Sequence, residues 1–355
     1  MSGKRVTSLD VARQAGVSRT TVSFVLNNVV GMQISEETKK RVLEAARDLG
    51  YVPDAAAQAL ASGRSKTIGL LLARQPHAIA SDMFLTQIME VLVREVNQFG
   101  MRLLLEVVED FENQEAYLKL VRSNSIDGIL YSGPRYDDAA LRLMVEHKVP
   151  TVLMGALPGT PYYFVDVDNR AAARQAVSHL LELGHRRIGC ITNADPSYAA
   201  AADRLKGYED ALHQAGLDVT EGLVRYGNFD AESGYAEMNS LLEKAQDLTA
   251  VFVASDVVAF GAMSAIREHG LRIPRDISLI GFDDVLMSRY MHPSLTTVQL
   301  PVVELARRAS EMVVELINGE QPDEPQVLLS ANLIVRNSCR ALNDCEDLTK
   351  NCEDI

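Results

Sequence analysis

The first sixty residues of the chain carry a pattern of turn-forming and apolar residues that predicts a helix-turn-helix. Ser8 can cap a first helix with its apolar side chains on one face. Gly16 can end that helix in the left-handed conformation, and Val17 then fills the corner of the turn. Ser18 can cap a second helix over residues 19–27. The apolar positions expected to face inward are Leu9, Val11, Ala12, Ala15, Val22, Val25 and Leu26.

A third helix is predicted behind this pair. Ser35 is its expected cap, Glu36 and Glu37 lie in its positive first turn, and Gly50 follows its end. Such a small three-helix head could bind DNA, or it could be a structural cap on a larger domain. DNA binding is favoured by the outward side chains of the second helix, which are short and form hydrogen bonds, as a helix in the major groove requires. These side chains are Arg19, Thr20, Thr21, Ser23 and Asn27.

The charge of the chain is divided unevenly between this head and the rest. Through Arg64 there are nine Lys or Arg against six Asp or Glu, a net charge of +3. The whole chain carries −13, which leaves −16 for the residues that follow. A basic head on an acidic body is typical of a nucleic-acid-binding unit whose body is repelled by the phosphates.

The head resembles that of the LacI/GalR family of bacterial transcriptional repressors. The resemblance lies in D-V-A-x-x-A-G-V-S-x-x-T-V-S-x-V-L-N, followed by S-E-E-T and L-G-Y-x-P, and it continues to about Cys339. It implies a cytoplasmic, nucleoid-associated homodimer that binds a pseudo-palindromic double-stranded DNA operator and is controlled by a small-molecule effector, expected to be a sugar. The positions that match the family's DNA contacts are Thr7, Ser18, Arg19, Thr20, Thr21, Ser23, Phe24, Asn27 and Leu60.

The chain departs from the family pattern at positions that bear on specificity. Phe24 stands where arginine is common, and a phenyl ring can contact a thymine methyl group but cannot form two hydrogen bonds with guanine. Ser255 replaces a common asparagine, and Gly155 stands where some sugar-responsive members have aspartate. A nucleobase or another small metabolite is therefore an alternative to a sugar.

A short helix is predicted after Pro53, where Asp54 is a suitable cap and Ser62-Gly63 ends the segment after about two turns. A helix this short is marginal in water, so it needs a packing partner. The resemblance implies that residues 54–65 form a hinge that packs against its twin in the DNA minor groove, where Leu60 enters between base steps. The alternative is an alanine-rich flexible linker.

From Lys66 onward the pattern alternates between apolar strands and helices, which predicts an α/β fold of parallel sheets covered on both faces. Strands are expected at residues 68–73, 101–108, 127–132, 151–155, 187–192, 250–254 and 277–282. Helices are expected at residues 82–99, 112–123, 137–148, 169–184, 200–216, 232–245 and 256–270. Two such blocks indicate two Rossmann-like lobes, and the resemblance implies the two-lobed core of periplasmic binding proteins.

The expected domains are a DNA-binding head over residues 1–53, a hinge over 54–65, a core over 66–340 and an acidic, disordered tail over 341–355. Within the core, lobe one is assigned residues 66–160 and 293–325, and lobe two residues 161–292 and 326–340. The tail is too short for its heptad-like spacing to predict a coiled coil.

Ligands of open α/β sheets bind at the carboxyl ends of the strands, so polar residues there are candidates for effector contacts. Arg204 and Asp283 follow predicted strands, and a guanidinium and a carboxylate facing one cleft can hold adjacent hydroxyls. By resemblance these two are the polar anchors, Ser255 is a third contact, and Phe84 contributes an aromatic face. Helix-capping or structural roles are the alternatives for Asp168, Asn169, Asp256 and Asp284.

Other classes of function lack their sequence signals. There is no apolar run of membrane-spanning length and no secretion signal, which argues against a transport binding protein and predicts a cytoplasmic location. No P-loop, G-x-S-x-G or G-x-G-x-x-G is present, and the Asp283-Asp284 pair is a poor acid-base dyad, because adjacent side chains point in different directions. The four cysteines form no metal-binding or disulfide pattern. We therefore expect neither an enzyme nor a cofactor.

Overall fold

The computed structural model describes residues 6–27, 32–52, 63–72, 76–108, 117, 125–136 and 138–342. It divides into two units, Met1–Lys66 with Asn124–Asp127, and Thr67–Ser123 with Gly128–Ile355. Most of the expected hinge with Leu60, the helix expected over residues 112–123 apart from Tyr117, and the tail from residue 343 lie outside the described residues.

The first unit contains the three predicted helices, α1 (Ser8–Ala15), α2 (Arg19–Leu26) and α3 (Glu36–Asp48). Ser18 and Ser35 cap α2 and α3 as predicted, each accepting a hydrogen bond from the backbone N–H three residues later. The prediction that Ser8 caps α1 is wrong. Thr7 is the cap, because its backbone N–H and its hydroxyl both donate to the carboxylate of Asp10 in a local pairing that Ser8 does not make.

A small apolar core holds the three helices together. It consists of Val11, Ala12, Ala15, Val22, Val42, Ala45 and Ala46, with Val17, Val25 and Leu26 partly buried against it. Gly16 ends α1 with φ +65°, a left-handed conformation that glycine adopts without strain. The expectation that Leu9 faces this core is wrong, since Leu9 is 46% exposed and does not belong to the core cluster. The sequence thus forms the predicted helix-turn-helix with a slightly narrower apolar face.

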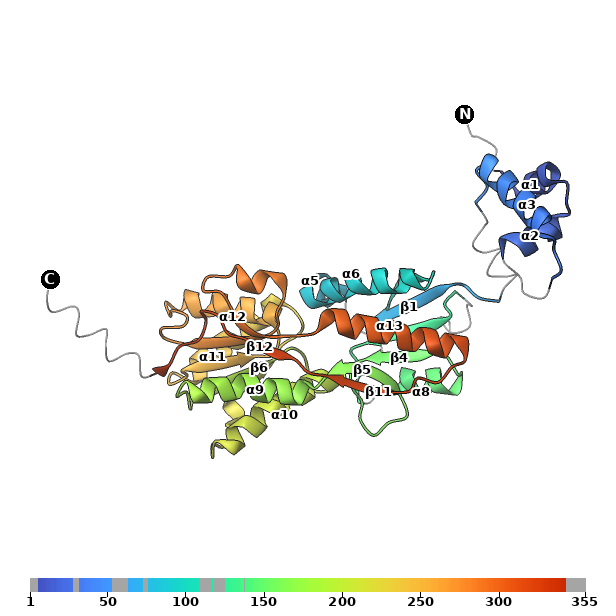
Figure 1. The fold of residues 1–355 in the computed structure, drawn as a ribbon. Helices are drawn as coiled ribbons and strands as arrows, with labels where there is room; N and C mark the ends of the chain where they lie inside the picture. The colour runs from blue at the N-terminus through green and yellow to red at the C-terminus, as the bar shows by residue number, and fades with distance from the viewer. Residues whose placement is uncertain are drawn as a thin grey trace. The chain divides into compact units, whose positions relative to one another are not determined.

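The second unit begins with a six-stranded sheet in the order β11-β5-β4-β3-β1-β2, which defines lobe one (Figure 1). All its neighbouring strands run parallel. Helices α6 (Met83–Gln98) and α13 (Val302–Asn318) pack against each other, and α13 covers β3, β4 and β5. The strands are β1 (Thr67–Leu72), β2 (Arg102–Val107), β3 (Gly128–Ser132), β4 (Thr151–Met154), β5 (Tyr163–Val167) and β11 (Gln326–Leu329). Two further helices are α5 (Pro76–Ser81) and α8 (Ala139–Glu146).

Lobe two is a second six-stranded sheet in the order β12-β10-β9-β8-β6-β7, in which only β12 pairs antiparallel. The helix pair α9 and α10 lies on one side of this sheet and the pair α11 and α12 on the other (Figure 1). The strands are β6 (Ile188–Thr192), β7 (Val224–Tyr226), β8 (Ala250–Val253), β9 (Ser278–Asp283), β10 (Thr296–Gln299) and β12 (Asn332–Ile334). The helices are α9 (Asn169–Glu182), α10 (Ala199–Gln214), α11 (Ala231–Lys244) and α12 (Asp256–Glu268), with short 3-10 turns η1 (Glu221–Leu223) and η2 (Leu286–Arg289).

The chain passes between the lobes three times, after β5, after β10 and between β11 and β12. The lobe boundaries expected from the sequence are therefore wrong at three strands. Strand β5 lies in lobe one because Tyr163 pairs with Val152 of β4, and β11 joins it there because Gln326 pairs with Phe164. Strand β10 lies in lobe two, because Val298 pairs with Phe282. Strand pairing between distant segments sets these boundaries, and the local pattern of apolar residues does not reveal it.

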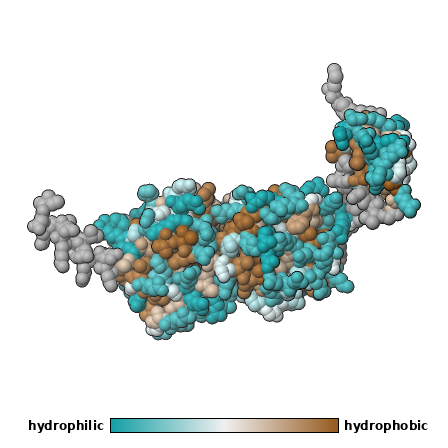
Figure 2. All heavy atoms as spheres, in the orientation of Figure 1, coloured by the Kyte–Doolittle hydropathy of each residue, from teal (hydrophilic) through white to brown (hydrophobic). Residues whose placement is uncertain are grey.

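A continuous apolar core runs through both lobes and joins β1, β3 and β5 to α9, α10 and the centre of the second sheet. Cys190 is fully buried in it. Among the described residues, no helix is long and apolar enough to cross a membrane. On the face of the molecule drawn in Figure 2, separate apolar areas interrupt a mainly hydrophilic surface on the two-lobed unit.

Candidate functional site

The described residues that were predicted to contact DNA lie on and around α2; Leu60 lies outside the described residues. Arg19 and Thr20 are exposed, and Thr21, Ser23, Phe24 and Asn27 are partly exposed. Several are held in place by neighbours on the same unit. The guanidinium of Arg19 donates to the hydroxyl of Ser8 at 3.0 Å, and the amide of Asn27 donates to the hydroxyl of Ser23 at 3.1 Å. Thr7 and Ser18 both lie at helix N-termini, where backbone N–H groups can receive a phosphate.

The four predicted effector residues, Phe84, Arg204, Ser255 and Asp283, line one cavity between the lobes. Phe84 is on α6, Arg204 is on α10, Ser255 follows β8 and Asp283 ends β9. The cavity encloses about 90 Å³. Lobe one contributes residues from the carboxyl ends of β3 and β4, and from β5 and the start of α6; they are Ser132, Gly133, Pro134, Met154, Gly155, Asp166 and Asp82. We call this cavity with its lining the cleft.

Among the described residues of the cleft lining, Arg204 is the one positively charged residue. Its guanidinium already donates hydrogen bonds to three acceptors. It donates to the side chain of Asn169 at 2.8 Å, to the carbonyl oxygen of Ala254 at 2.7 Å and to the carboxylate of Asp283 at 3.4 Å. Its guanidinium also lies over the ring of Phe282, 3.8 Å from the centroid. Because this side chain is already ordered, its remaining N–H groups can bind a ligand with little further loss of conformational entropy.

Two carboxyl groups of the cleft have raised pKa values, the buried Asp283 and the partly buried Asp166. Burial raises the pKa of Asp283 to about 8, although the nearby guanidinium of Arg204 opposes the shift. Burial also raises the pKa of Asp166 to about 6, against the backbone N–H groups of Ala156 and Val167 that donate to it. Carboxyl groups with raised pKa values in a cleft gain from polar ligand groups that replace the water they have lost.

The structure adds residues that sequence reasoning missed. Tyr198 and Phe229 line the cleft and meet edge to face, with ring centroids 5.2 Å apart. Asn193 follows β6, and its buried side-chain oxygen has no hydrogen-bond partner within the described chain. The rule that ligands bind at carboxyl ends of strands could have found Asn193, since it comes directly after a predicted strand. Nothing local indicates Tyr198 or Phe229, which lie in connections that reach the cleft only in the folded protein.

The remaining polar candidates have structural roles. The carboxylate of Asp168 caps α9 by accepting from the backbone N–H of Ala171 at 2.9 Å. Asp284 accepts from Arg336 at 2.6 Å and from Gln299 at 2.9 Å, and it is not part of the cleft lining. Asp256 is fully buried and accepts from the hydroxyls of Ser288 and Thr297 and from the backbone N–H of Val285. Asn169 joins Asp166 to Arg204.

A loop of lobe one reaches across the cleft to lobe two. The backbone N–H of Tyr136 donates to Ser197 at 3.2 Å, and the N–H of Ala199 donates to Pro134 at 3.1 Å. The guanidinium of Arg135 also lies 5.2 Å from the ring centroid of Tyr198. These contacts hold the cleft closed.

A helix-turn-helix unit joined in one chain to a two-lobed core with a polar cleft defines a class, the ligand-controlled DNA-binding regulators. Comparison with known proteins gives the family. Residues 7–54 match the lacI family of bacterial regulatory proteins, and residues 177–339 match the periplasmic binding protein-like domain. The chain is 33% identical over 338 residues to the transcriptional regulator CelR of Thermobifida fusca, covering 94% of this chain and 98% of CelR. It is 34% identical to the repressor PurR of Klebsiella pneumoniae subsp. pneumoniae, covering 93% of this chain and 95% of PurR.

Solved structures agree. A CelR–cellobiose complex, 33% identical, superimposes with a TM-score of 0.73 and covers 94% of this chain and 100% of its own. A lac repressor dimer bound to operator and the anti-inducer ONPF, 29% identical, has a TM-score of 0.83 over 95% of this chain and 100% of its own. The chain belongs to the LacI family. It is a sequence-specific DNA-binding transcriptional regulator and not an enzyme.

Proposed function

We propose that this regulator is a repressor whose operator affinity is controlled by a neutral sugar bound in the cleft. The observation that carries the proposal is the chemistry of the cleft lining. Asp82, Asp166 and Asp283 line the cleft together with a single guanidinium among the described residues, that of Arg204, which is already bonded to Asp283. Hydroxyl groups can donate to carboxylates and accept from Arg204, so a polyol suits this lining.

The same lining disfavours an anionic ligand. A phosphate group would lie near three carboxyl groups, and Arg204, the cation among the described lining residues, is already paired with Asp283. Like charges within a desolvated site repel strongly, because little water is left to screen them. The aromatic side chains Phe84, Tyr198 and Phe229 offer apolar faces to the C–H side of a sugar ring. The name of the CelR–cellobiose complex makes cellobiose the first sugar to test.

Ligand entry requires the cleft to open. Its volume of about 90 Å³ is below the ~300 Å³ at which small-molecule pockets usually begin. The contacts of Pro134 and Tyr136 with lobe two must therefore break and form again around the ligand. A sugar that fits one arrangement of the lobes better than the other shifts the balance between them, and with it the operator affinity.

We further propose that the DNA-binding side chains are those predicted on and around α2, and that the protein acts on the nucleoid as a cytoplasmic homodimer. Two heads on a two-fold operator bind far more tightly than one. Exposed apolar side chains suited to a dimer contact lie on α6 and on the edge strand β2; they are Val93, Leu105 and Val107. The hinge over residues 54–65 and the wedge role of Leu60 are part of this proposal and rest on the family resemblance alone.

The test begins with selection of operator DNA from random duplexes by the purified protein, followed by operator titrations with cellobiose, other neutral sugars, sugar phosphates and purines. A neutral sugar should change operator affinity at least fivefold. Arg204→Lys should lose this response but keep operator binding, because lysine cannot hold Asn169, Ala254 and the ligand together.

Arg187→Lys is the matched control, since Arg187 is an exposed arginine that pairs with Asp247, outside the cleft lining. It should respond to the sugar as the wild type does. A response only to a purine would replace the sugar by a nucleobase as effector, and a response only to sugar phosphates would overturn the charge argument.

A further inference from the structure

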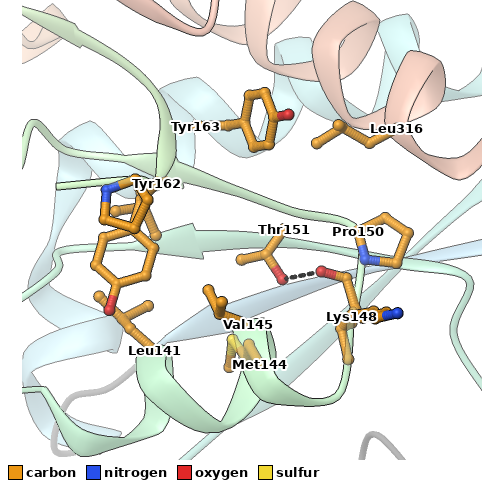
Figure 3. Close-up of a pocket in the computed structure, with 12 residues that line it drawn as sticks. Leu141, Met144, Val145, Lys148, Pro150, Thr151, Tyr162, Tyr163 and Leu316 are labelled. Atoms are coloured by element: carbon orange, nitrogen blue, oxygen red, sulfur yellow. Dashed lines mark hydrogen bonds between the residues drawn. The ribbon is translucent and has the colours of Figure 1, made fainter. Parts of the chain in front are cut away.

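A second cavity lies within lobe one, away from the cleft lining. It encloses about 280 Å³ and is lined by α8, by the amino ends of β4 and β5 and by the end of α13. In Figure 3, Leu141, Met144 and Val145 come from α8 on one side, and Tyr163 and Leu316 face them from the other. This volume has room for roughly ten water-sized groups at ~30 Å³ each, which corresponds to a small organic molecule.

The walls of this cavity are mainly carbon, and Lys148 is the charged residue of its described lining. Pro150 and Pro161 have no backbone N–H to offer, and the hydroxyl of Thr151 is bonded to the carbonyl oxygen of Val149 at 3.0 Å. The phenol hydroxyls of Tyr162 and Tyr163 have no hydrogen-bond partner among the described residues, so either hydroxyl can bind a polar group of a ligand. Such a site suits a neutral, largely apolar molecule with a single hydrogen-bonding group.

This cavity and the cleft share two strands. In β4, Thr151 and Leu153 line the cavity, and Met154 lines the cleft. In β5, Tyr163 lines the cavity and Asp166 the cleft. A ligand that shifts the amino ends of these short strands therefore acts on the segments that carry Met154 and Asp166, because packed strands move together.

We infer that this cavity is an accessory ligand site for small, neutral, mainly apolar molecules, and that its occupancy changes the affinity of the cleft for its effector. The binding part of this inference does not depend on the sugar proposal. Indole is a suitable probe, with an aromatic body of fitting size and one N–H donor for a phenol oxygen. The chain has no tryptophan, so indole fluorescence reports on the probe alone.

The experiment titrates the full-length protein into indole and follows the fluorescence shift, with equilibrium dialysis as a second measurement. Wild-type protein should bind one indole per chain saturably. Val145→Phe and Leu316→Phe fill the cavity from opposite walls and should each weaken binding at least tenfold. Val335→Phe is the control, because it makes the same change as Val145→Phe at an exposed valine of lobe two. This variant should bind indole as the wild type does. Thermal melts of all variants establish that they are folded.

Titrations with cellobiose distinguish binding in the cavity from binding in the cleft. Saturating indole should change the dissociation constant of cellobiose at least twofold, and cellobiose should change that of indole by the same factor without displacing it. Unaltered indole binding by both cavity-filling variants would overturn the site, as would competitive displacement by cellobiose. An unchanged cellobiose affinity would overturn the coupling. Failure of cellobiose to bind in the absence of indole would count against the sugar proposal alone.

Discussion

At the scale of single residues, the buried carboxyl group of Asp256 connects the elements that carry cleft residues. Asp256 lies at the start of α12 and binds both η2, through Ser288, and β10, through Thr297. It therefore joins the helix that follows Ser255 to the strand that pairs with β9, which ends at Asp283. A buried hydrogen-bond network is stable only if each of its polar groups has a partner. Removal of the Asp256 carboxyl group should therefore disturb the cleft.

Replacement of Asp256 by asparagine should reveal this carboxyl through the pH dependence of stability. Burial raises its pKa to about 7, above the ~3.9 of an unfolded aspartate. The native state therefore holds the proton more tightly than the unfolded state, and stability from this group is lost as the pH rises from about 4 through 7. Asp256→Asn does not titrate. Its melting temperature relative to the wild type should rise steadily from pH 5 to pH 8, and a constant difference would contradict the raised pKa.

Phe24 should set the preference of the recognition helix for its DNA half-site. Its ring is partly exposed on α2, one helical turn from Thr20. Phe24→Arg should move the selected half-site toward guanine, with a gain of ~1 to 3 kcal/mol for the new base, because a guanidinium forms two hydrogen bonds with guanine. Selection of random duplexes by both proteins measures the change. Identical selected sequences would show that residue 24 does not contact a base.

At the scale of elements, the packing of α11 against α12 depends on two glycines. A Cβ atom on Gly261 would overlap the carbonyl oxygen of Ala231, and one on Gly234 would overlap that of Val258. The helices approach so closely because neither residue has a side chain at the contact. This pair covers one face of the second sheet and supports β8 and β9, whose ends carry Ser255 and Asp283.

Gly261→Ala should destabilise the core by about 2 to 3 kcal/mol, since the helices would have to move apart to admit the methyl group. The matched control is Gly222→Ala in η1, where a Cβ atom meets nothing within 4 Å. Its stability should change by less than ~0.5 kcal/mol. Urea denaturation measures the free energy of unfolding of both variants. Equal losses would show that the close approach of the two helices does not depend on glycine at residue 261.

At the scale of the whole molecule, charge is divided between a head of net +3 and a body of net −16. The head is attracted to DNA phosphates and the body is repelled by them, so the protein should approach DNA with its head. Binding by such a protein releases counterions from the DNA, which makes affinity fall steeply with salt.

Operator affinity should therefore fall about a thousandfold or more between 50 and 200 mM salt, the range expected for several phosphate contacts. The affinity for a neutral sugar should change little over the same range, because no charge is neutralised in the cleft. Fluorescence anisotropy for operator DNA and calorimetry for the sugar measure the two dependences on one preparation. A flat salt dependence for the operator would contradict phosphate binding by the head.

Much of the fold and part of the site could be predicted because the signals are local. Caps at Ser18 and Ser35 and the left-handed Gly16 act over a single helical turn, and all three are observed where predicted. The alternation of apolar strands and helices gave two parallel-sheet lobes, because strands buried on both faces need a continuous apolar run. Arg204 and Asp283 could be placed in one cleft from the rule that binding residues follow strands.

The sequence by itself thus determined most of the helices and strands and the class of fold, and with the family resemblance it determined the four polar and aromatic residues that meet in the cleft. It did not predict helices α5 and α13. Only the tertiary structure decided that β5 and β11 belong to lobe one and β10 to lobe two. The pairing of Gln326 with Phe164 joins segments more than a hundred residues apart, and β10 pairs with β9 just before the chain crosses back to lobe one. Only the tertiary structure brought Asp166, Asn193, Tyr198 and Phe229 to Arg204. The physical reason is that periodicity reports which face of an element is buried, and pairing between distant segments decides against what it is buried.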